Sequence, residues 1–130
     1  MSVKATAKGV RMSPRKVREV AALVRGRSVA DALVILSNTP RRAASPVYKV
    51  IASARANAEH NNNLKPDTLM ITEISVTAGA RIKRFRPAAQ GRALPFQRKS
   101  AHIFVTGDGE VRKKPTRTAA KADADEKEAK

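Results

Sequence analysis

The sequence contains no cysteine and no tryptophan, and aromatic residues make up only 3% of its 130 residues. Without cysteine, disulfide frameworks, thiolate zinc sites and a cysteine nucleophile are excluded. So few aromatic rings argue against a broad stacking surface of the kind that RNA-recognition motifs use. The first residues hold no apolar run of signal-peptide length, and no segment approaches the roughly 20 apolar residues of a membrane span. We therefore expect a soluble, intracellular protein with one compact domain plus appendages.

Acidic residues are also scarce, and they are unevenly distributed. The chain has 27 Lys and Arg against 11 Asp and Glu, a formal net charge of +16. Residues 107–130 hold seven basic and six acidic residues, which leaves 20 basic and five acidic residues for positions 1–106. Nearly the whole excess therefore lies in the part that carries folding signals. Such a body repels itself in water and requires a polyanionic partner, of which nucleic acid is the commonest.

Three helices are predicted in the first half of the chain. The first begins at Ser13, an N-cap residue followed by proline, and ends at Gly26. The second begins at Ser28. The third runs from about residue 41 or 43 to about 60, where apolar residues recur at helical spacing and Pro46 fits only in the first turn.

Strand signals surround these helices. Residues 3–12 alternate apolar with polar or basic side chains, a weak strand signal with one basic face. Alternation in residues 69–78 and 101–106 predicts two further strands, and residues 107–109 read as a turn that closes the folded part.

The predicted domain spans residues 1–109, and residues 110–130 are predicted to be a disordered tail because their low-complexity composition cannot bury a core. The predicted core is aliphatic and small: Val17, Val20, Leu23, Val24, Leu33, Leu36, Val50, Ile51, Ile74, Val76, Ile103 and Val105. A free domain of this kind should be modestly stable and should gain stability from a bound partner.

The connection between the last two strands, residues 79–100, is long and has no acidic residue. Its basic residues are Arg81, Lys83, Arg84, Arg86, Arg92, Arg98 and Lys99. If the flanking strands continue, it forms a two-stranded arm that turns near Pro87–Gly91 and reaches roughly 35 Å. An isolated hairpin is marginal in water, so such an arm belongs inside a polyanion. The alternative is a disordered basic loop that orders on RNA.

A second candidate site lies at the start of the first helix. Arg15, Lys16 and Arg18 occupy the end where the helix dipole already presents positive charge. A phosphate bound by the free backbone N–H groups, the Ser13 hydroxyl and these side chains would make that placement favourable.

Other basic residues allow two explanations. Arg25 and Arg27 follow the first helix, where cations complement the helix dipole as readily as they would contact RNA. Arg41 and Arg42 repeat the unusual placement of cations before a helix, and are weaker candidates for phosphate contacts.

Residues alone leave two other functions open. An architectural DNA-binding protein would share the basic charge, although no predicted helix carries a basic stripe along its whole length. A small RNA hydrolase would need Glu59 and His60 as an acid–base pair, but such a pair at a helix end is more often plain surface. His102 is more often a packed or RNA-facing residue than a ligand, and a Gly-Asp-Gly turn explains Asp108. We predict no enzyme, no metal and no cofactor.

Five segments carry more specific information: SPRKVR at 13–18, VRGRSV at 24–29, ARANAEHN at 54–61, GARIKRFRPAAQGRA at 79–93 and SAHI at 100–103. In order and spacing they resemble the bacterial family of large-subunit ribosomal protein twenty-two, over roughly residues 4–106. The resemblance implies an α+β fold, with three helices packed on a small antiparallel sheet and a long protruding β-hairpin arm.

The same resemblance implies a structural protein of the large ribosomal subunit in the cytoplasm. Its body would bind 23S rRNA near the peptide exit and assist early subunit assembly, while the tip of its arm would line the polypeptide exit tunnel. The expected partners are 23S rRNA, other large-subunit proteins and the nascent peptide. No membrane and no homo-oligomer are expected.

Carried onto this sequence, the resemblance and the charge pattern select the same two regions. The expected rRNA-binding residues are Ser13, Arg15, Lys16, Arg18, Arg81, Lys83, Arg84, Arg86, Arg92, Arg98 and Lys99. The expected tunnel-lining tip is Arg86, Pro87, Ala88, Ala89, Gln90, Gly91 and Arg92. The chain departs from the family at Ala88 and Gln90, where basic residues are usual. Pro95 lacks a backbone donor in the returning strand, which predicts a bulge or an edge there.

Overall fold

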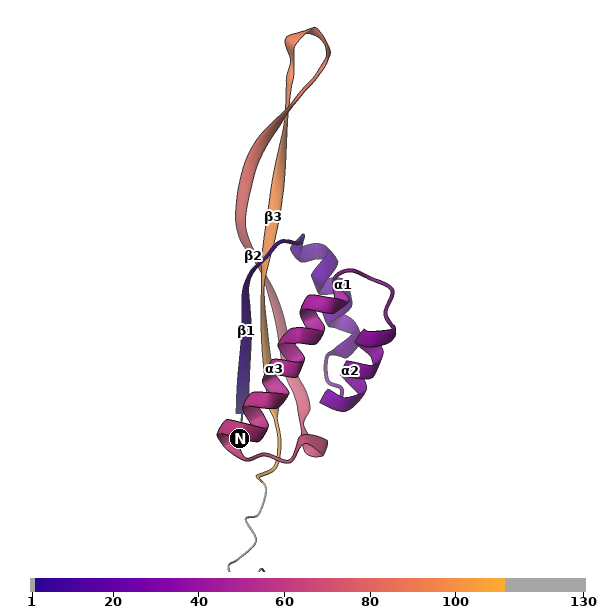
Figure 1. The fold of residues 1–130 in the computed structure, drawn as a ribbon, viewed down its shortest axis with the longest axis vertical. Helices are drawn as coiled ribbons and strands as arrows, with labels where there is room; N and C mark the ends of the chain where they lie inside the picture. The colour runs from indigo at the N-terminus through magenta and orange to yellow at the C-terminus, as the bar shows by residue number, and fades with distance from the viewer. Residues whose placement is uncertain (1, 112–130) are drawn as a thin grey trace, which may run out of the picture.

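A three-stranded antiparallel sheet packed against three helices makes up the body of the computed structural model, which describes residues 2–111 (Figure 1). Helices α1 and α3 lie on the sheet, and α2 packs mainly on α3. The predicted α+β class is confirmed. The elements are β1 (Ser2–Val10), α1 (Pro14–Val24), α2 (Val29–Asn38), α3 (Ala44–Asn62), η1 (Pro66–Thr68), β2 (Met70–Pro87), η2 (Ala89–Gly91) and β3 (Ala93–Asp108).

The three helices begin close to where the sequence predicts them, and α3 runs two residues beyond its predicted end at about residue 60. Ser28 Oγ accepts a hydrogen bond of 3.1 Å from the backbone N–H of Asp31, which satisfies a free donor at the start of α2. Helix α3 starts late enough that Pro46 falls in its first turn. It ends at Asn63, whose left-handed backbone (φ 49°) is a conformation that asparagine tolerates.

The strand order is β1-β3-β2, so β3 is the central strand. Val105 lies opposite Ala5 on one side and Ile74 on the other, and all three side chains are buried against the helices. Register shifts interrupt the pairing between Ala7 and Val10 and between Ala78 and Arg81. Both of these irregularities lie beside the base of the arm, and a third register shift, between Ile71 and Glu73, lies near the other end of β2.

The core is aliphatic, as predicted, but one of its predicted members, Leu23, lies outside it, and another, Leu33, packs against it only partly buried. Leu23 is 48% exposed and Leu33 is half-buried. Val17, Val20, Ala21 and Val24 form the buried stripe of α1, and at about 100° per residue Leu23 lies roughly 110° away from the middle of that stripe. The remaining predicted core residues are buried. The core also takes in buried residues around the connection between α3 and β2: Leu64, Leu69 and Ile71.

The predicted turn at residues 107–109 is wrong, because β3 continues to Asp108. Gly107 pairs with both Val3 and Ile71, so central-strand pairing overrides the turn signal of the two glycines. After it, the carbonyl of Glu110 accepts a hydrogen bond of 3.0 Å from the N–H of Lys65. The predicted disordered tail lies, from residue 112 onward, outside the described residues.

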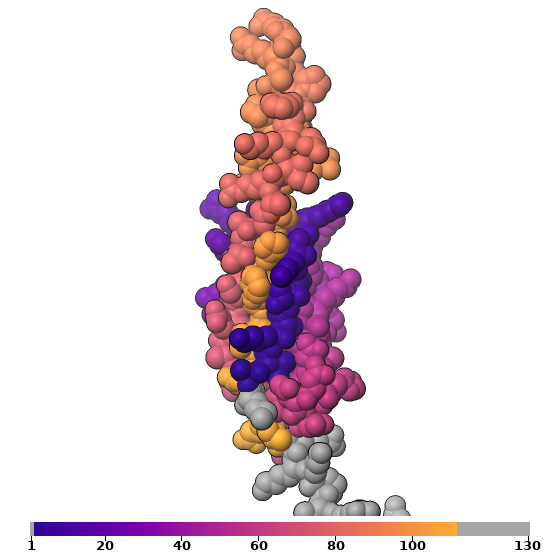
Figure 2. All heavy atoms as spheres, turned by 90° about the vertical axis from the view of Figure 1, so that its left-hand side faces the viewer, coloured from indigo at the N-terminus to yellow at the C-terminus, as the bar shows by residue number. Residues whose placement is uncertain are grey.

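The predicted arm is confirmed as a hairpin. Strands β2 and β3 leave the body together and stay paired until Pro87 lies opposite Ala93. The space-filling view shows the arm as a narrow projection clear of the helices (Figure 2). Pro95 lies in regular register with Phe85, in a stretch where β3 has β2 as its only strand partner. The expected edge position of Pro95 is therefore confirmed, without a bulge.

Candidate nucleic-acid interface

The start of α1 presents uncommitted donors. Ser13 occupies the N-cap position, but its side chain makes no capping hydrogen bond, and the first turn has no acidic residue. Arg15 and Lys16 are exposed beside it. Free backbone N–H groups at a helix start, with a hydroxyl and two cations nearby, form an arrangement that favours an anion.

Arg18 is held differently from its two neighbours. Its Nε donates a hydrogen bond of 3.0 Å to the carbonyl oxygen of Val76, and about two turns further on Arg25 Nη2 donates one of 3.2 Å to the carbonyl of Ile74. These carbonyls belong to β2, an edge strand of the sheet. The two arginines therefore satisfy part of that edge and fasten α1 to it. This structural role was not expected from the sequence.

Arg27, which follows α1, has the first of the two roles considered for it, complementing the helix dipole. Arg27 Nε donates a hydrogen bond of 3.0 Å to the carbonyl of Leu23 in the last turn of α1. Its guanidinium thus complements the negative end of the helix dipole.

A cavity of about 630 Å³ lies where the arm leaves the body. Its walls come from three parts of the chain: the connection from β1 to α1, the base of the arm on β2 and the base of the arm on β3. The lining residues are Gly9, Arg11, Met12, Ser13, Ala80, Ile82, Gln97, Arg98, Lys99 and Ser100. The two regions that the sequence selected separately, the helix start and the arm, therefore meet in one place.

A second cavity, of about 570 Å³, shares Arg11, Met12 and Ser13 with the first. It continues across the start of α1 to the start of α3. Together the two cavities, here called the junction cleft, are lined by six cations and one acid: Arg11, Lys16, Arg41, Arg42, Arg98, Lys99 and Glu19. A concave surface of one charge sign concentrates counter-ions, so the cleft suits a phosphate backbone.

Two details of the cleft qualify the sequence analysis. Arg41 and Arg42 were the two weaker candidates for phosphate contacts. Arg41 is paired with an acid, since its Nη1 lies 2.6 Å from Glu19 Oε2, while Arg42 beside it is exposed. Arg11 lines both cavities and was missed. Its position in the short connection directly before Ser13 was the signal that could have found it.

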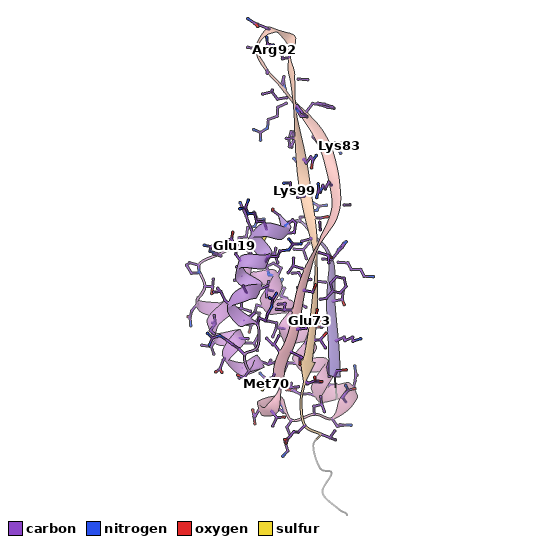
Figure 3. All side chains as sticks on the ribbon, turned by 180° about the vertical axis from the view of Figure 1, so that it is seen from behind. Glu19, Met70, Glu73, Lys83, Arg92 and Lys99 are labelled. Carbon is purple, nitrogen blue, oxygen red and sulfur yellow. The ribbon has the colours of Figure 1, made fainter. Side chains whose placement is uncertain are left out.

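The register of the arm sorts its side chains onto two faces, because residues opposite each other in a sheet share a face. One face carries the pairs Arg81–Lys99, Lys83–Gln97, Phe85–Pro95 and Pro87–Ala93. The other carries Ile82–Arg98, Arg84–Phe96 and Arg86–Leu94. Every basic residue predicted in the arm is exposed, and Figure 3 shows Lys83, Lys99 and Arg92 spaced along its length.

The base of the arm is fixed by close backbone contacts. Ser100 Oγ donates a hydrogen bond of 2.7 Å to the carbonyl of Ala80, and His102 Nδ1 accepts one of 2.9 Å from the N–H of Gly9. His102 is thus a packed residue, one of its two expected roles. These bonds join the three strands where the arm begins, so they set its direction relative to the junction cleft.

The tip is a tight turn. The N–H of Ala88 donates to the carbonyl of Arg92 at 2.8 Å, and two successive residues, Gln90 (φ 60°) and Gly91 (φ 67°), have left-handed backbones. The turn expected to line a tunnel therefore presents mostly small side chains and backbone atoms. Arg86 and Arg92 lie on either side of it.

The acid–base pair of the hydrolase interpretation is not assembled. Glu59 Oε1 lies 3.0 Å from Arg55 Nε, one helical turn away, and His60 is exposed. Across residues 2–111, no three His, Asp or Glu side chains gather in a way that could hold a metal ion. No helix within that range is long and apolar enough to cross a membrane.

A small α+β body with a cationic arm and a cation-lined cleft at its root defines a basic protein with an extended surface suited to a polyanion. Residues 5–107 match the family of ribosomal protein L22p/L17e, and the chain belongs to that family. It is 51% identical to large ribosomal subunit protein uL22 of Oceanobacillus iheyensis over 105 residues, which cover 81% of this chain and 93% of the relative. It is 50% identical to the protein of the same name from Synechococcus sp. strain JA-3-3Ab over 103 residues, 79% of this chain and 84% of the relative.

The resemblance predicted from the five segments is thereby confirmed. The family is one of ribosomal structural proteins, so the prediction that the chain is not an enzyme is confirmed as well. Its members belong to the large ribosomal subunit, which is cytoplasmic in bacteria, as expected.

Proposed function

We propose that this chain binds 23S rRNA through its arm and the junction cleft, as a structural constituent of the large ribosomal subunit. The arm carries this proposal. It is a two-stranded hairpin with both faces exposed, it has seven basic residues and no acid between positions 79 and 100, and it makes no core of its own. Arg81 and Lys99 lie directly opposite each other, an unfavourable pairing that bound phosphates would reverse.

The body provides the second half of the interface. Ser13 and Lys16 at the start of α1 line the same junction cleft as Arg98 and Lys99 at the arm base, and Arg15 is exposed beside them. One RNA backbone could therefore contact the helix start and the arm root together. Phosphate contacts of this kind position a protein on RNA without reading its sequence. The unit that binds is the predicted domain 1–109, with Arg18 as both an anchor of α1 and an rRNA contact.

In this proposal the tip of the arm lines the polypeptide exit tunnel, where it contacts the nascent peptide. Support comes from family membership and from the shape of the tip, which is a narrow turn of small residues at the far end of the arm (Figures 1 and 3). Such a tip fits a confined space between RNA segments. Because the arm would become ordered on rRNA, the protein would take part in early subunit assembly. Other large-subunit proteins are its expected neighbours, and it acts as a single copy without forming a homo-oligomer.

An architectural DNA-binding protein is the contrasting possibility, and the helices disfavour it. Helix α2 contains no Lys or Arg, and two of the arginines on or next to α1 are engaged with β2 carbonyls. A recognition helix would need a free basic face to enter the major groove.

Binding to purified 23S rRNA and to duplex DNA, each over a series of salt concentrations, tests the proposal. The matched variant replaces Arg84–Phe96 with Asn-Gly, which closes the pair Lys83–Gln97 with a two-residue hairpin turn and keeps the arm base. We expect the wild type to prefer rRNA with a steep salt dependence, and the short-arm variant to lose part of the affinity and part of the slope. Equal binding of DNA, or no effect of shortening the arm, would contradict the proposal.

A further inference from the structure

Phe85 has the highest exposed fraction, 70%, among the large hydrophobic side chains that the structure describes. It lies about midway along the arm, in a chain with only three phenylalanines and no tryptophan. The arm projects clear of the helices, and no part of residues 2–111 covers this ring (Figure 2). An aromatic ring on an isolated, highly cationic hairpin has no role in the free protein's core.

The surroundings of Phe85 differ on its two sides. Toward the tip, its face of the arm is apolar and uncharged, with Pro95 opposite and Pro87 two residues on. Toward the body, the next residue on that face is Lys83, followed by the pair Arg81–Lys99. A flat, open hydrophobic surface thus borders a row of cations.

The other ring of the arm, Phe96, provides a contrast. It lies on the opposite face, is half-buried, and is covered by Arg86, whose guanidinium carbon is 5.1 Å from the ring centroid. That cation–π contact already satisfies the face of Phe96. Phe85 has no such cover in the described structure.

We infer that Phe85 stacks on an unpaired nucleobase of the rRNA, with the ammonium group of Lys83 on a neighbouring phosphate. This inference rests on the proposed rRNA binding and adds a specific contact to it. The cations around Phe85 attract the phosphates of a polyanion, and a nucleobase is the planar π surface that comes with those phosphates. Aromatic side chains beside a basic track are the usual means of holding single-stranded nucleic acid, and they tolerate any base.

A single-tryptophan variant tests the contact directly. Because the chain lacks tryptophan, Phe85→Trp places one indole at this position and its fluorescence reports that site alone. We expect strong quenching when 23S rRNA is added, since a stacked base quenches indole emission. Phe96→Trp, on the guanidinium-covered face, is the matched control and should be quenched much less.

Affinity provides the second measurement. Phe85→Leu keeps an apolar side chain but removes the stacking surface, so we expect rRNA binding to weaken by roughly fivefold to a hundredfold, with a smaller change for Phe96→Leu. The thermal unfolding of Phe85→Leu should match the wild type, because the ring is exposed. Unquenched Phe85→Trp together with unchanged affinity of Phe85→Leu would overturn the inference, and the ring would then face a protein or peptide. The preference of the wild type for rRNA over DNA is measured separately, so that result would leave the proposed function standing.

Discussion

Gly79 and Ser100 face each other across the base of the arm so closely that a methyl group added to Gly79 would lie 2.5 Å from Ser100 Oγ. The same methyl group would lie 3.2 Å from two ring atoms of His102. Since Ser100 and His102 both make hydrogen bonds that join the strands there, neither can move without breaking one. The glycine is thus required by close approach and not by backbone conformation.

Gly79→Ala should therefore destabilise the protein by about 1–3 kcal/mol, the usual range for forcing extra volume into a packed site. Urea unfolding followed by circular dichroism measures this. Removing the hydroxyl first, with Ser100→Ala, should reduce the effect of the alanine, because the closest contact is then gone. An equal loss in both backgrounds would show that this contact is not the cause.

Arg18 and Arg15 are three residues apart on α1 but should respond differently to alanine. Arg18→Ala loses the hydrogen bond to the carbonyl of Val76, and should lower the free energy of unfolding by about 1 kcal/mol. Arg15→Ala, at the exposed helix start, should leave stability unchanged, weaken rRNA binding and reduce the salt slope by about one. Denaturant titration and salt-dependent binding on the same two variants separate these roles. Equal stability of both variants would count against the anchoring of α1 by Arg18.

Lys99→Glu should move arm order and rRNA binding in opposite directions. It converts the like-charge pair with Arg81 into an attractive one, which should favour the arm in the free protein by roughly 0.2–1 kcal/mol. It should also weaken rRNA binding and flatten its salt dependence, because a cation in the junction cleft is replaced by an anion. Amide hydrogen exchange in the arm and filter binding give the two readouts, with Lys99→Gln as the neutral intermediate. Tighter rRNA binding by the glutamate variant would contradict the assignment of the cleft.

Gly91→Ala should disturb the tip and leave the body unaffected. Its backbone angle φ is 67°, and a Cβ in the left-handed region costs roughly 1–2 kcal/mol. Faster hydrogen exchange at the amides of Ala88 and Arg92, which are bonded across the turn, should report the change while the unfolding midpoint stays the same. Gly91→Asn should cost less, since asparagine tolerates this conformation. Identical exchange for the alanine and asparagine variants would rule out backbone strain as the cause.

The local patterns of the sequence predicted the elements well. Caps such as Ser28, the alternation in the strands and the acid-free segment between them act over a few residues, so they predict the helices, the sheet and the arm. Leu23 was misplaced because it was judged by hydrophobicity alone, although it lies off the stripe of Val17, Val20, Ala21 and Val24 that faces the core. The Gly107–Gly109 turn failed because pairing on both sides of a central strand outweighs turn propensity.

The helix start and the arm were predicted as two separate parts of the candidate site, but the cleft in which they meet was not predicted. Arg18 and Val76 are 58 residues apart, and the hydrogen bond between them depends on which strand forms the edge beside α1. Likewise, Arg11 and Arg98 line one cavity because of the direction in which the arm leaves the body, at a point where β2 has a register shift and Ser100 is bonded to Ala80. Long-range geometry of this kind leaves no mark in the spacing of residues along a single sequence.

The continuity of β3 also has a mechanical consequence. The strand that returns from the tip of the arm is the same one that is paired on both sides in the middle of the body. A force that pulls the tip along the arm axis acts on β2 and β3 together, so it is carried as shear across the hydrogen bonds between β3 and β1 and across the contacts of β2 with α1. The folded body anchors the arm, and a load on the tip is resisted by the unfolding barrier of the sheet in that body.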